Sequence, residues 1–387
     1  MTTPCKILVV DDEPDLEPLL LQRMRREIRR KEYDFTFAHN GVEALQKLRE
    51  DDTIQVVLSD INMPEMDGLT LLQEIPSVNP DIRSVIISAY GDMKNIRMAM
   101  NRGAFDFVTK PIDFDDLRVT IKRTVEQLQI WHDAMSARDE LLSINNELSI
   151  ASTMQQSILP KSFPNGDNFE ISGTMRAARD VGGDFFDIYQ LEGDKVGMCI
   201  ADVSDKGVPA ALFMMSSRST MKGTAIGTLD PADVIRDVNE FLCEDNMANM
   251  FVTVLYAIVD TRSGMITYAN GGHNPPLVVS ASGETRFLPM PEGIALGMFN
   301  MSFDKMTHRL DAGDTLIMYT DGVTEAANQE NDLYGEERLM DVVSQAVRDG
   351  KDDLIDSIMK SIDDFSQGLD QTDDITCISF RFDGYKS

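Results

Sequence analysis

The residues with the clearest chemical potential in the first third of the chain stand at the ends of short apolar segments. Asp11 and Asp12 follow one segment, Asp60 and Lys110 follow two more, and Ser88 ends a fourth. Three carboxylates gathered in one place repel one another unless a cation lies among them, and an all-oxygen site favours Mg²⁺. A carboxylate beside Mg²⁺ can accept a phosphoryl group, whose oxygens a nearby ammonium and hydroxyl group can then bind.

The segments that must position these residues predict a parallel sheet. Short apolar runs without alternation are typical of strands buried on both faces, and helical patterns such as Leu16–Lys31 and Gly41–Arg49 lie between them. The expected strands are Lys6–Val10, Asp34–Ala38, Gln55–Ser59, Ser84–Ser88 and Phe105–Thr109. In such α/β sheets the functional site lies at the carboxyl ends of the strands, which is where the acids fall.

These segments resemble the response-regulator receiver family over about 115 residues. The motifs that carry the resemblance are VVDDE (Val9–Glu13), LSDINMPEMDG (Leu58–Gly68), ISAYGD (Ile87–Asp92) and FVTKP (Phe107–Pro111). The resemblance implies a flavodoxin-like domain of five parallel strands over residues 1–120. It assigns the phosphoacceptor to Asp60. It assigns an Mg²⁺ site to Asp11, Asp12, Asp60 and the Asn62 carbonyl. It assigns the switch residues to Ser88, Phe107 and Lys110, and it makes Lys110–Pro111 a cis peptide.

The last 230 residues carry a second set of acids, again at strand ends and turns. They lie in GGDFFD (Gly182–Asp187), ADVSDKG (Ala201–Gly207), YTDG (Tyr319–Gly322) and TDDIT (Thr372–Thr376). A single Asp after a strand is usually a turn former, but four clusters with adjacent glycines suit Mg²⁺ or Mn²⁺. Two such ions about 4 Å apart can activate water for attack on phosphorus. Strand-like runs joined by turns, with two longer helical patterns at Ala210–Thr224 and Ala232–Glu244, predict an antiparallel α+β domain.

This part resembles the protein phosphatase 2C superfamily, in its bacterial sporulation and stress-response branch, from about Glu147 to Phe382. Besides the acidic clusters, the motifs are ELSIASTMQQSILP (Glu147–Pro160), MFVTVLYAIVD, YANGGHNPPLV and GDTLIMYTDGVTEA. The resemblance implies a β-sandwich flanked by helices over residues 159–387, with two Mn²⁺ or Mg²⁺ ions. It assigns their ligands to Asp184, Asp202, the Val203 carbonyl, Asp321, Asp373 and Asp374.

Three further residues near these motifs have open roles. Arg179 could grip the substrate phosphate, although Arg176 competes for that role and either could be a surface charge. His273 could protonate the leaving group, but a His in a Gly-Pro-rich turn more often braces a loop. Asp205 stands where many relatives have Gly, so it places an additional negative charge near the metals.

The connector between the two domains, residues 121–158, predicts a long helix. It contains neither Gly nor Pro, and an apolar stride of seven residues runs through Ile121, Leu128, Met135 and Leu142 before it changes phase. Heptads indicate a coiled coil, so we expect a homodimer through this helix. The alternative is that the helix packs on its own domains in a monomer.

The composition of the chain bears on its expected partners and location. A net charge of −29 repels phosphate backbones and anionic lipid, so nucleic acid and membrane are not expected as partners. Four scattered cysteines and no signal or membrane-spanning pattern favour the cytoplasm.

Together the resemblances predict a response regulator whose output is dephosphorylation of phosphoserine or phosphothreonine on a protein. The expected partners are a sensor histidine kinase or phosphotransfer protein and, as substrate, a phosphorylated anti-sigma-factor antagonist in a partner-switching pathway. The alternative is a catalytically silent adaptor that binds a sigma factor or another regulator. Retention of Asp184, Asp202, Asp321 and Asp373 favours the enzyme.

Overall fold

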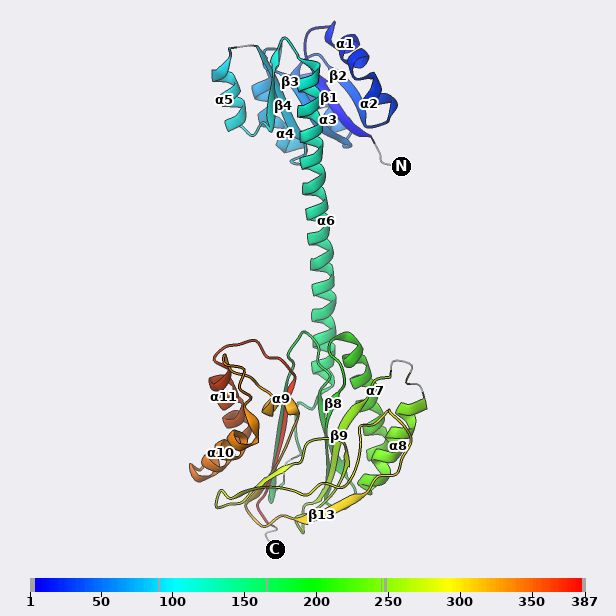
Figure 1. Cartoon of the computed structure of the whole chain (residues 1–387), viewed down its shortest axis with the longest axis vertical. Coiled ribbons are helices and arrows are strands. Elements are labelled where there is room, and N and C mark those ends of the chain that lie inside the picture. Colours follow the sequence, from blue (N-terminus) through cyan, green and yellow to red (C-terminus); the bar gives the residue numbers. More distant parts are fainter. Residues whose placement is uncertain (1–3, 90, 165, 245, 247–248, 385–387) are drawn as a thin grey trace. The chain divides into compact units, whose positions relative to one another are not determined.

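The chain divides into two compact units, and the division falls inside its longest helix. The computed structural model describes residues 4–89, 91–164, 166–244, 246 and 249–384. The N-terminal unit is Met1–Ser143 and the C-terminal unit is Ile144–Ser387. The helix α6, Phe114–Ile158, begins in the first unit and ends in the second (Figure 1).

The N-terminal unit is built on five parallel strands in the order β2-β1-β3-β4-β5, which confirms the predicted sheet. The strands are β1 Cys5–Val10, β2 Tyr33–Ala38, β3 Ile54–Asp60, β4 Arg83–Ala89 and β5 Asp106–Lys110. The helices before α6 are α1 Leu16–Arg23, α2 Arg25–Arg29, α3 Gly41–Glu50, α4 Gly68–Val78 and α5 Met93–Asn101. Asn40 and Asp67 cap α3 and α4 by accepting hydrogen bonds from backbone N–H groups of the first turn.

The sequence predicted one helix over Leu16–Lys31, but the structure has two, α1 and α2. They meet at Met24, whose backbone (φ −96°, ψ 13°) leaves the helical region. The Met24 side chain is fully buried with Leu20 in the core on one face of the sheet. Periodicity does not reveal such a break, because the apolar spacing on both sides of it remains helical.

Helix α6 uses part of its predicted coiled-coil seam within the N-terminal unit. Ile121 and Leu128 are buried, Ile121 in the core cluster that also contains Val9 and Val108 of the sheet. These two positions are therefore not available to a partner helix, which corrects the prediction of a seam that starts at residue 121. Further along, Leu141, Leu142 and other apolar residues are exposed, and they remain unpaired in the described chain.

The C-terminal unit contains two five-stranded antiparallel sheets, which confirms the predicted α+β fold. One sheet has the order β13-β10-β9-β8-β7, and the other has the order β12-β11-β14-β15-β6. Their strands are β6 Phe169–Arg176, β7 Phe185–Leu191, β8 Lys195–Val203, β9 Val252–Asp260, β10 Met265–Gly271, β11 Leu277–Val279, β12 Thr285–Phe287, β13 Lys305–Arg309, β14 Asp314–Tyr319 and β15 Ile375–Phe382.

The two sheets pack face to face, and helices cover their outer faces (Figure 1). Side chains such as Phe186, Met198, Met318 and Phe380 fill the space between the sheets. Helices α7 Val208–Ala225 and α8 Pro231–Glu244 pack on the first sheet. Helices α9 Asp321–Thr324, α10 Gly335–Arg348 and α11 Leu354–Ser366 pack on the second sheet. The acidic motifs lie at the ends of β7, β8, β14 and β15, so the sandwich brings four distant segments to one place.

Candidate functional site

The N-terminal unit gathers three carboxylates at the carboxyl ends of its strands. Asp11 and Asp12 follow β1 and Asp60 ends β3, and one oxygen from each lies within 4.8 Å of the others. Asp11 and Asp60 are buried, whereas Asp12 is exposed. Burial, more than any neighbouring charge, raises the pKa of Asp11. Such an all-oxygen group has the chemistry of an Mg²⁺ site.

Lys110 at the end of β5 neutralises part of this charge. Its Nζ lies 2.7 Å from Asp60 Oδ2, 2.9 Å from Asp11 Oδ2 and 3.0 Å from Glu13 Oε1. Burial by itself lowers the pKa of Lys110, but the hydrogen bonds to Asp60, Asp11 and Glu13 raise it more, so the group stays charged. The peptide bond from Lys110 to Pro111 is cis, as predicted.

The remaining predicted residues surround Asp60. Its Oδ1 accepts hydrogen bonds from the N–H groups of Ile61 (2.6 Å) and Asn62 (3.4 Å). The Ser88 hydroxyl is buried and has no hydrogen-bond partner in the described chain, so it is free to bind an added phosphoryl oxygen. Phe107 is 37% exposed on the strand next to Ser88.

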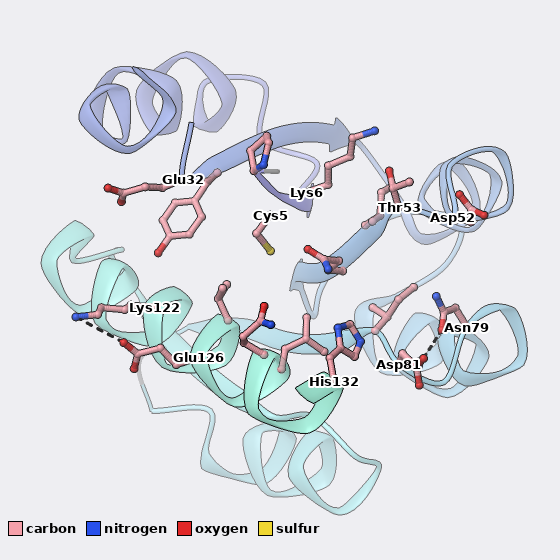
Figure 2. Close-up of a pocket in the computed structure, with 18 of the residues that line it drawn as sticks. Cys5, Lys6, Glu32, Asp52, Thr53, Asn79, Asp81, Lys122, Glu126 and His132 are labelled. Carbon is pink, nitrogen blue, oxygen red and sulfur yellow. Dashed lines mark hydrogen bonds and ion pairs between the residues drawn. The ribbon is translucent and has the colours of Figure 1, made fainter. Parts of the chain in front are cut away.

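A cavity of about 990 Å³ in this unit lies elsewhere (Figure 2). Cys5, Tyr33 and Ile54 line it at the amino ends of their strands, together with Lys122 and His132 of α6. Asp60 and Lys110 stand at the carboxyl ends, so this cavity is not part of the carboxylate site.

In the C-terminal unit, Asp184 is the most enclosed acid of the predicted site. It is 1% exposed, and its Oδ2 accepts hydrogen bonds from the hydroxyls of Thr320 and Thr376, both at 2.7 Å. Burial and the neighbouring charges of Asp202 and Asp374 raise its pKa well above the usual range. The two threonines belong to the quoted YTDG and TDDIT motifs, but their spacing in the sequence did not predict this role.

The pKa of Asp202 is affected by four other acids of the group, Asp184, Asp321, Asp373 and Asp374. Burial and the charge of Asp321 raise its pKa to about 7, although the nearby Asp184 side chain lowers it. Asp373 and Asp374 contribute smaller repulsions. Burial and the charges of Glu325 and Asp373 also raise the pKa of Asp321. Carboxylates that disfavour their own ionisation in this way are a suitable environment for divalent cations, which would relieve the repulsion.

The C-terminal acids are more widely spaced than those of the N-terminal unit. Among the described residues, no three of them bring one oxygen each within 4.8 Å of one another. Asp373 forms an ion pair of 2.9 Å with Lys206. Its neighbour Asp374 uses both oxygens on backbone N–H groups, at 2.8 Å from Ala178, 2.6 Å from Gly183 and 3.2 Å from Asp184. Asp374 therefore orders the loop that holds Asp184.

Glycines allow the segments of this site to approach one another closely. A Cβ atom on Gly182 would lie 2.4 Å from Asp374 Oδ2, and one on Gly322 would lie 1.9 Å from the Asp374 carbonyl oxygen. A Cβ on Gly183 would lie 3.0 Å from the Val203 carbonyl oxygen, the predicted backbone ligand. Any larger residue at Gly322 would push the Asp321 and Asp374 segments apart.

Gln155 near the end of α6 contacts the same loop, a role that the sequence did not predict. Its Nε2 donates to the Gly182 carbonyl oxygen (2.6 Å), and its Oε1 accepts from the Gly182 N–H (3.0 Å). The side chain is 4% exposed. Gly182 is two residues before Asp184, so this paired hydrogen bond connects the linker helix to the acidic site. The only sequence signal was its place in the ELSIASTMQQSILP segment.

The His273 side chain bridges Thr253 of β9 and Tyr319 at the end of β14, two residues before Asp321. Its Nε2 lies 3.1 Å from the Tyr319 carbonyl oxygen, which can only accept, so Nε2 donates and Nδ1 accepts from the Thr253 hydroxyl at 2.8 Å. Burial lowers the pKa of His273 to about 4, so the ring is neutral at physiological pH. Both nitrogens are engaged, which favours the bracing role over that of a proton donor.

The two candidate arginines differ clearly. Arg176 is held by Gln371 Oε1 (2.7 Å) and by an ion pair with Asp363 (2.8 Å). Arg179 is exposed and makes no hydrogen bond or ion pair with any residue that the structure describes. It lies on the loop whose Ala178 N–H binds Asp374.

Asp205 adopts a left-handed backbone conformation with φ of 66°. Glycine adopts this conformation without strain, and Asp tolerates it better than most residues. This explains how Asp is accommodated at this position. We expect Asp205→Val to lower the free energy of unfolding by about 1–2 kcal/mol, whereas Asp205→Gly changes it by less than about 0.5 kcal/mol. Urea denaturation of both variants tests this, and equal effects would contradict the strain.

Comparison with known proteins supports both parts. The family model described as response regulator receiver domain matches residues 7–122, and the model described as stage II sporulation protein E (SpoIIE) matches residues 192–383. The chain is 26% identical over 269 residues to phosphoserine phosphatase RsbU of Bacillus subtilis, which covers 69% of the chain and 79% of RsbU. It is 32% identical over 262 residues to protein IcfG of Synechocystis sp., covering 60% of the chain but only 41% of IcfG.

One solved structure illustrates the C-terminal fold. The SiaA-PP2C domain of Pseudomonas aeruginosa matches 63% of this chain and 99% of its own, with a TM-score of 0.56 and 24% identity, which supports the fold alone. Within the described residues, no helix combines the length and apolar character that a membrane span requires.

Proposed function

We propose that this chain is a protein serine/threonine phosphatase controlled by phosphorylation of Asp60. Its first part belongs to the response-regulator receiver family, and its second part belongs to the SpoIIE family of PP2C-type phosphatases. The observation that carries the proposal is the convergence of Asp184, Asp202, Asp321 and Asp373. These acids come from four separate segments, and burial and the charges of neighbouring carboxylates raise the pKa of Asp184, Asp202 and Asp321. Divalent cations bound among them would relieve this repulsion.

The side chains of the C-terminal site have different proposed roles. Asp184, Asp202, Asp321 and Asp373, with the Val203 carbonyl, would hold two Mg²⁺ or Mn²⁺ ions. These ions supply positive charge for the phosphate and a more acidic water. Thr320 and Thr376 fix the orientation of Asp184, and Asp374 orders its loop. Arg179, exposed and unpaired within the described chain, would bind the substrate phosphate.

The receiver site would control this activity through its own charge. Asp11, Asp12, Asp60 and the Asn62 carbonyl would hold one Mg²⁺ ion. A phosphoryl group on Asp60 adds oxygens that Lys110 can bind, together with the Ser88 hydroxyl, which has no partner among the described residues. Phe107 would then change position. The kinase would be a sensor histidine kinase or a phosphotransfer protein.

The proposed substrate is a phosphoserine on an anti-sigma-factor antagonist, so the output would be control of transcription by partner switching. The relative RsbU is named a phosphoserine phosphatase, which supports this substrate class. A net charge of −29 disfavours nucleic acid and anionic membranes as partners. The unpaired cysteines favour the cytoplasm as the place of action.

Hydrolysis of p-nitrophenyl phosphate tests the proposal. With Mn²⁺ we expect the wild-type chain to hydrolyse it and Asp321→Asn to lose about 10²-fold or more in kcat/KM, because a charge that stabilises the cations is removed. Beryllofluoride, which mimics the phosphorylated receiver, should change the rate of the wild type but not that of Asp60→Asn. A wild-type chain inactive in every state, with metals in excess, would support the adaptor instead.

We also propose that the chain forms a homodimer through the exposed part of α6. Leu141 and Ile144, three residues apart on one face of the helix, are 60% and 47% exposed, and Leu142 beside them is 55% exposed. Exposed apolar surface of this kind on a helix is stabilised by a second copy. We expect light scattering to report a dimer that Leu142→Lys weakens, while Glu140→Lys, at a neighbouring exposed position, does not. A strict monomer at high concentration, with and without beryllofluoride, would contradict the dimer.

A further inference from the structure

A small cavity opens beside the acidic site of the C-terminal unit. Its volume is about 180 Å³, and Asp373 and Gly322 line it on the side of the predicted metal ligands. Its lining combines polar side chains with the buried apolar residues Ala326, Ile362 and Ile375. The cavity therefore shares Asp373 and Gly322 with the proposed phosphatase site.

The wall of this cavity is fixed by hydrogen bonds. Gln371 donates to the carbonyl oxygens of Arg176 (2.8 Å) and Asp373 (2.6 Å), and its Oε1 accepts from Arg176 Nε (2.7 Å). Arg176 also forms its ion pair with Asp363. The wall is thus formed before any substrate arrives, which lowers the entropic cost of binding.

Two of the acids that line the cavity are paired with cations of the described chain, and one is not. Asp363 is paired with Arg176, and Asp373 is paired with Lys206. Asp370 also lines the cavity, is exposed, and has no hydrogen-bonding or cationic partner among the described residues. Next to it, Leu369 is 46% exposed and adds apolar surface to the rim. A cavity that combines apolar surface with one unpaired carboxylate is complementary to a long cationic side chain.

We propose that this cavity selects protein substrates that carry a lysine or arginine close to the phosphoserine. The aliphatic stem packs against Ala327 and Leu369, and the charged end reaches the Asp370 carboxylate. An acidic residue at the same position is repelled by Asp370. This inference rests on the proposed phosphatase function and adds the specificity of the same site.

Phosphoserine peptides that differ at a single position test the inference. The varied position, occupied by Arg, Gln or Glu, is moved along the residues on both sides of the phosphoserine, and kcat/KM is measured with Mn²⁺. For at least one position we expect the wild type to prefer Arg over Glu by about fivefold, the effect of one exposed ion pair. The readout is the ratio of the two peptides for one enzyme, so it does not depend on the amount of active protein.

Variants of the cavity make the assignment specific. Asp370→Asn should bring the Arg/Glu ratio close to one at that position, and Asp370→Lys should invert it. Ala327→Leu should reduce the preference by filling the cavity without a change of charge. Asp364→Asn, which removes an exposed acid that does not line the cavity, should keep the wild-type ratio.

The outcomes separate this inference from the function on which it rests. If the wild type hydrolyses p-nitrophenyl phosphate and the peptides but shows no preference at any position, the cavity has no such role while the phosphatase remains. A wild-type ratio in Asp370→Lys would also exclude this role for the cavity. If neither p-nitrophenyl phosphate nor any peptide is hydrolysed, the phosphatase assignment and this inference both fail.

Discussion

Replacing Asp202 by asparagine is expected to remove the phosphatase activity while it stabilises the metal-free protein. Asp202 lies among Asp184, Asp321 and Asp373, and burial and the charge of Asp321 raise its pKa to about 7. Without a cation its charge is unfavourable, so its neutral replacement should raise the free energy of unfolding at pH 8 by on the order of 2 kcal/mol. Activity should fall by about 10²–10³-fold, as for the loss of one electrostatic group from an active site.

The pH dependence gives the same prediction a second test. In the unfolded chain the pKa of an aspartate is about 3.9, below its value of about 7 in the folded protein. Between these values the folded state binds more protons, so the free energy of unfolding of the metal-free protein falls as the pH rises from about 4 to about 7. Mn²⁺ should offset this loss, and Asp202→Asn should reduce it.

Thermal unfolding with and without EDTA, at several pH values, measures these effects. Asp364→Asn is a suitable control, because it also removes one aspartate charge but lies exposed, outside the group around Asp202. If Asp202→Asn keeps wild-type hydrolysis of p-nitrophenyl phosphate, the assignment of the metal site is wrong. If it destabilises the metal-free protein at pH 8, the electrostatic account of Asp202 is wrong.

Replacing Gln155, which lies on the linker helix α6, by methionine is expected to lower both the stability of the protein and the activity of the acidic site. Methionine keeps the volume of the side chain but makes neither of the two hydrogen bonds to Gly182. The buried Gly182 N–H and carbonyl groups then lose their partner, which should cost about 2 kcal/mol in the free energy of unfolding. Because Gly182 lies two residues before Asp184 in the same loop, activity should fall by about 10–100-fold, as for other residues that orient metal ligands.

A matched control stands next to Gln155 in the chain. Gln156 is exposed and makes no hydrogen bond with the described residues, so Gln156→Met should leave both stability and activity near the wild type. Measuring activity against Mn²⁺ concentration separates a role at the site from simple loss of folded protein. We expect Gln155→Met to require more Mn²⁺ for half-maximal activity. An unchanged Mn²⁺ requirement would show that Gln155 only stabilises the fold.

This connection also suggests how the receiver could act on the phosphatase. Helix α6 contains Ile121, buried in the receiver core, and Gln155, bound to the loop of Asp184. In the proposed regulation, the receiver would act by changing the contact between Gln155 and this loop. Such a signal needs a difference of about 5.5 kcal/mol between the two states to move the site from nearly off to nearly on.

The sequence by itself predicted the two folds and the places where the acids lie. Apolar runs that end in Asp11, Asp60 or Asp321 are local features, because a strand and its last residue are read from neighbours in the chain. The same applies to the long helix, whose lack of Gly and Pro is visible over residues 121–158. The family motifs then indicated which of these acids belong together.

Only the tertiary structure decided what each side chain contacts. The break at Met24 and the burial of Ile121 depend on packing against the sheet. The neutral, bracing His273 and the amide-bound Asp374 depend on which backbone groups lie opposite them. Thr376 reaches Asp184 across 192 residues of chain, and Gln155 reaches Gly182 across 27. Spacing along the sequence does not encode such pairs, because their distance is set by how the sheets and helices pack.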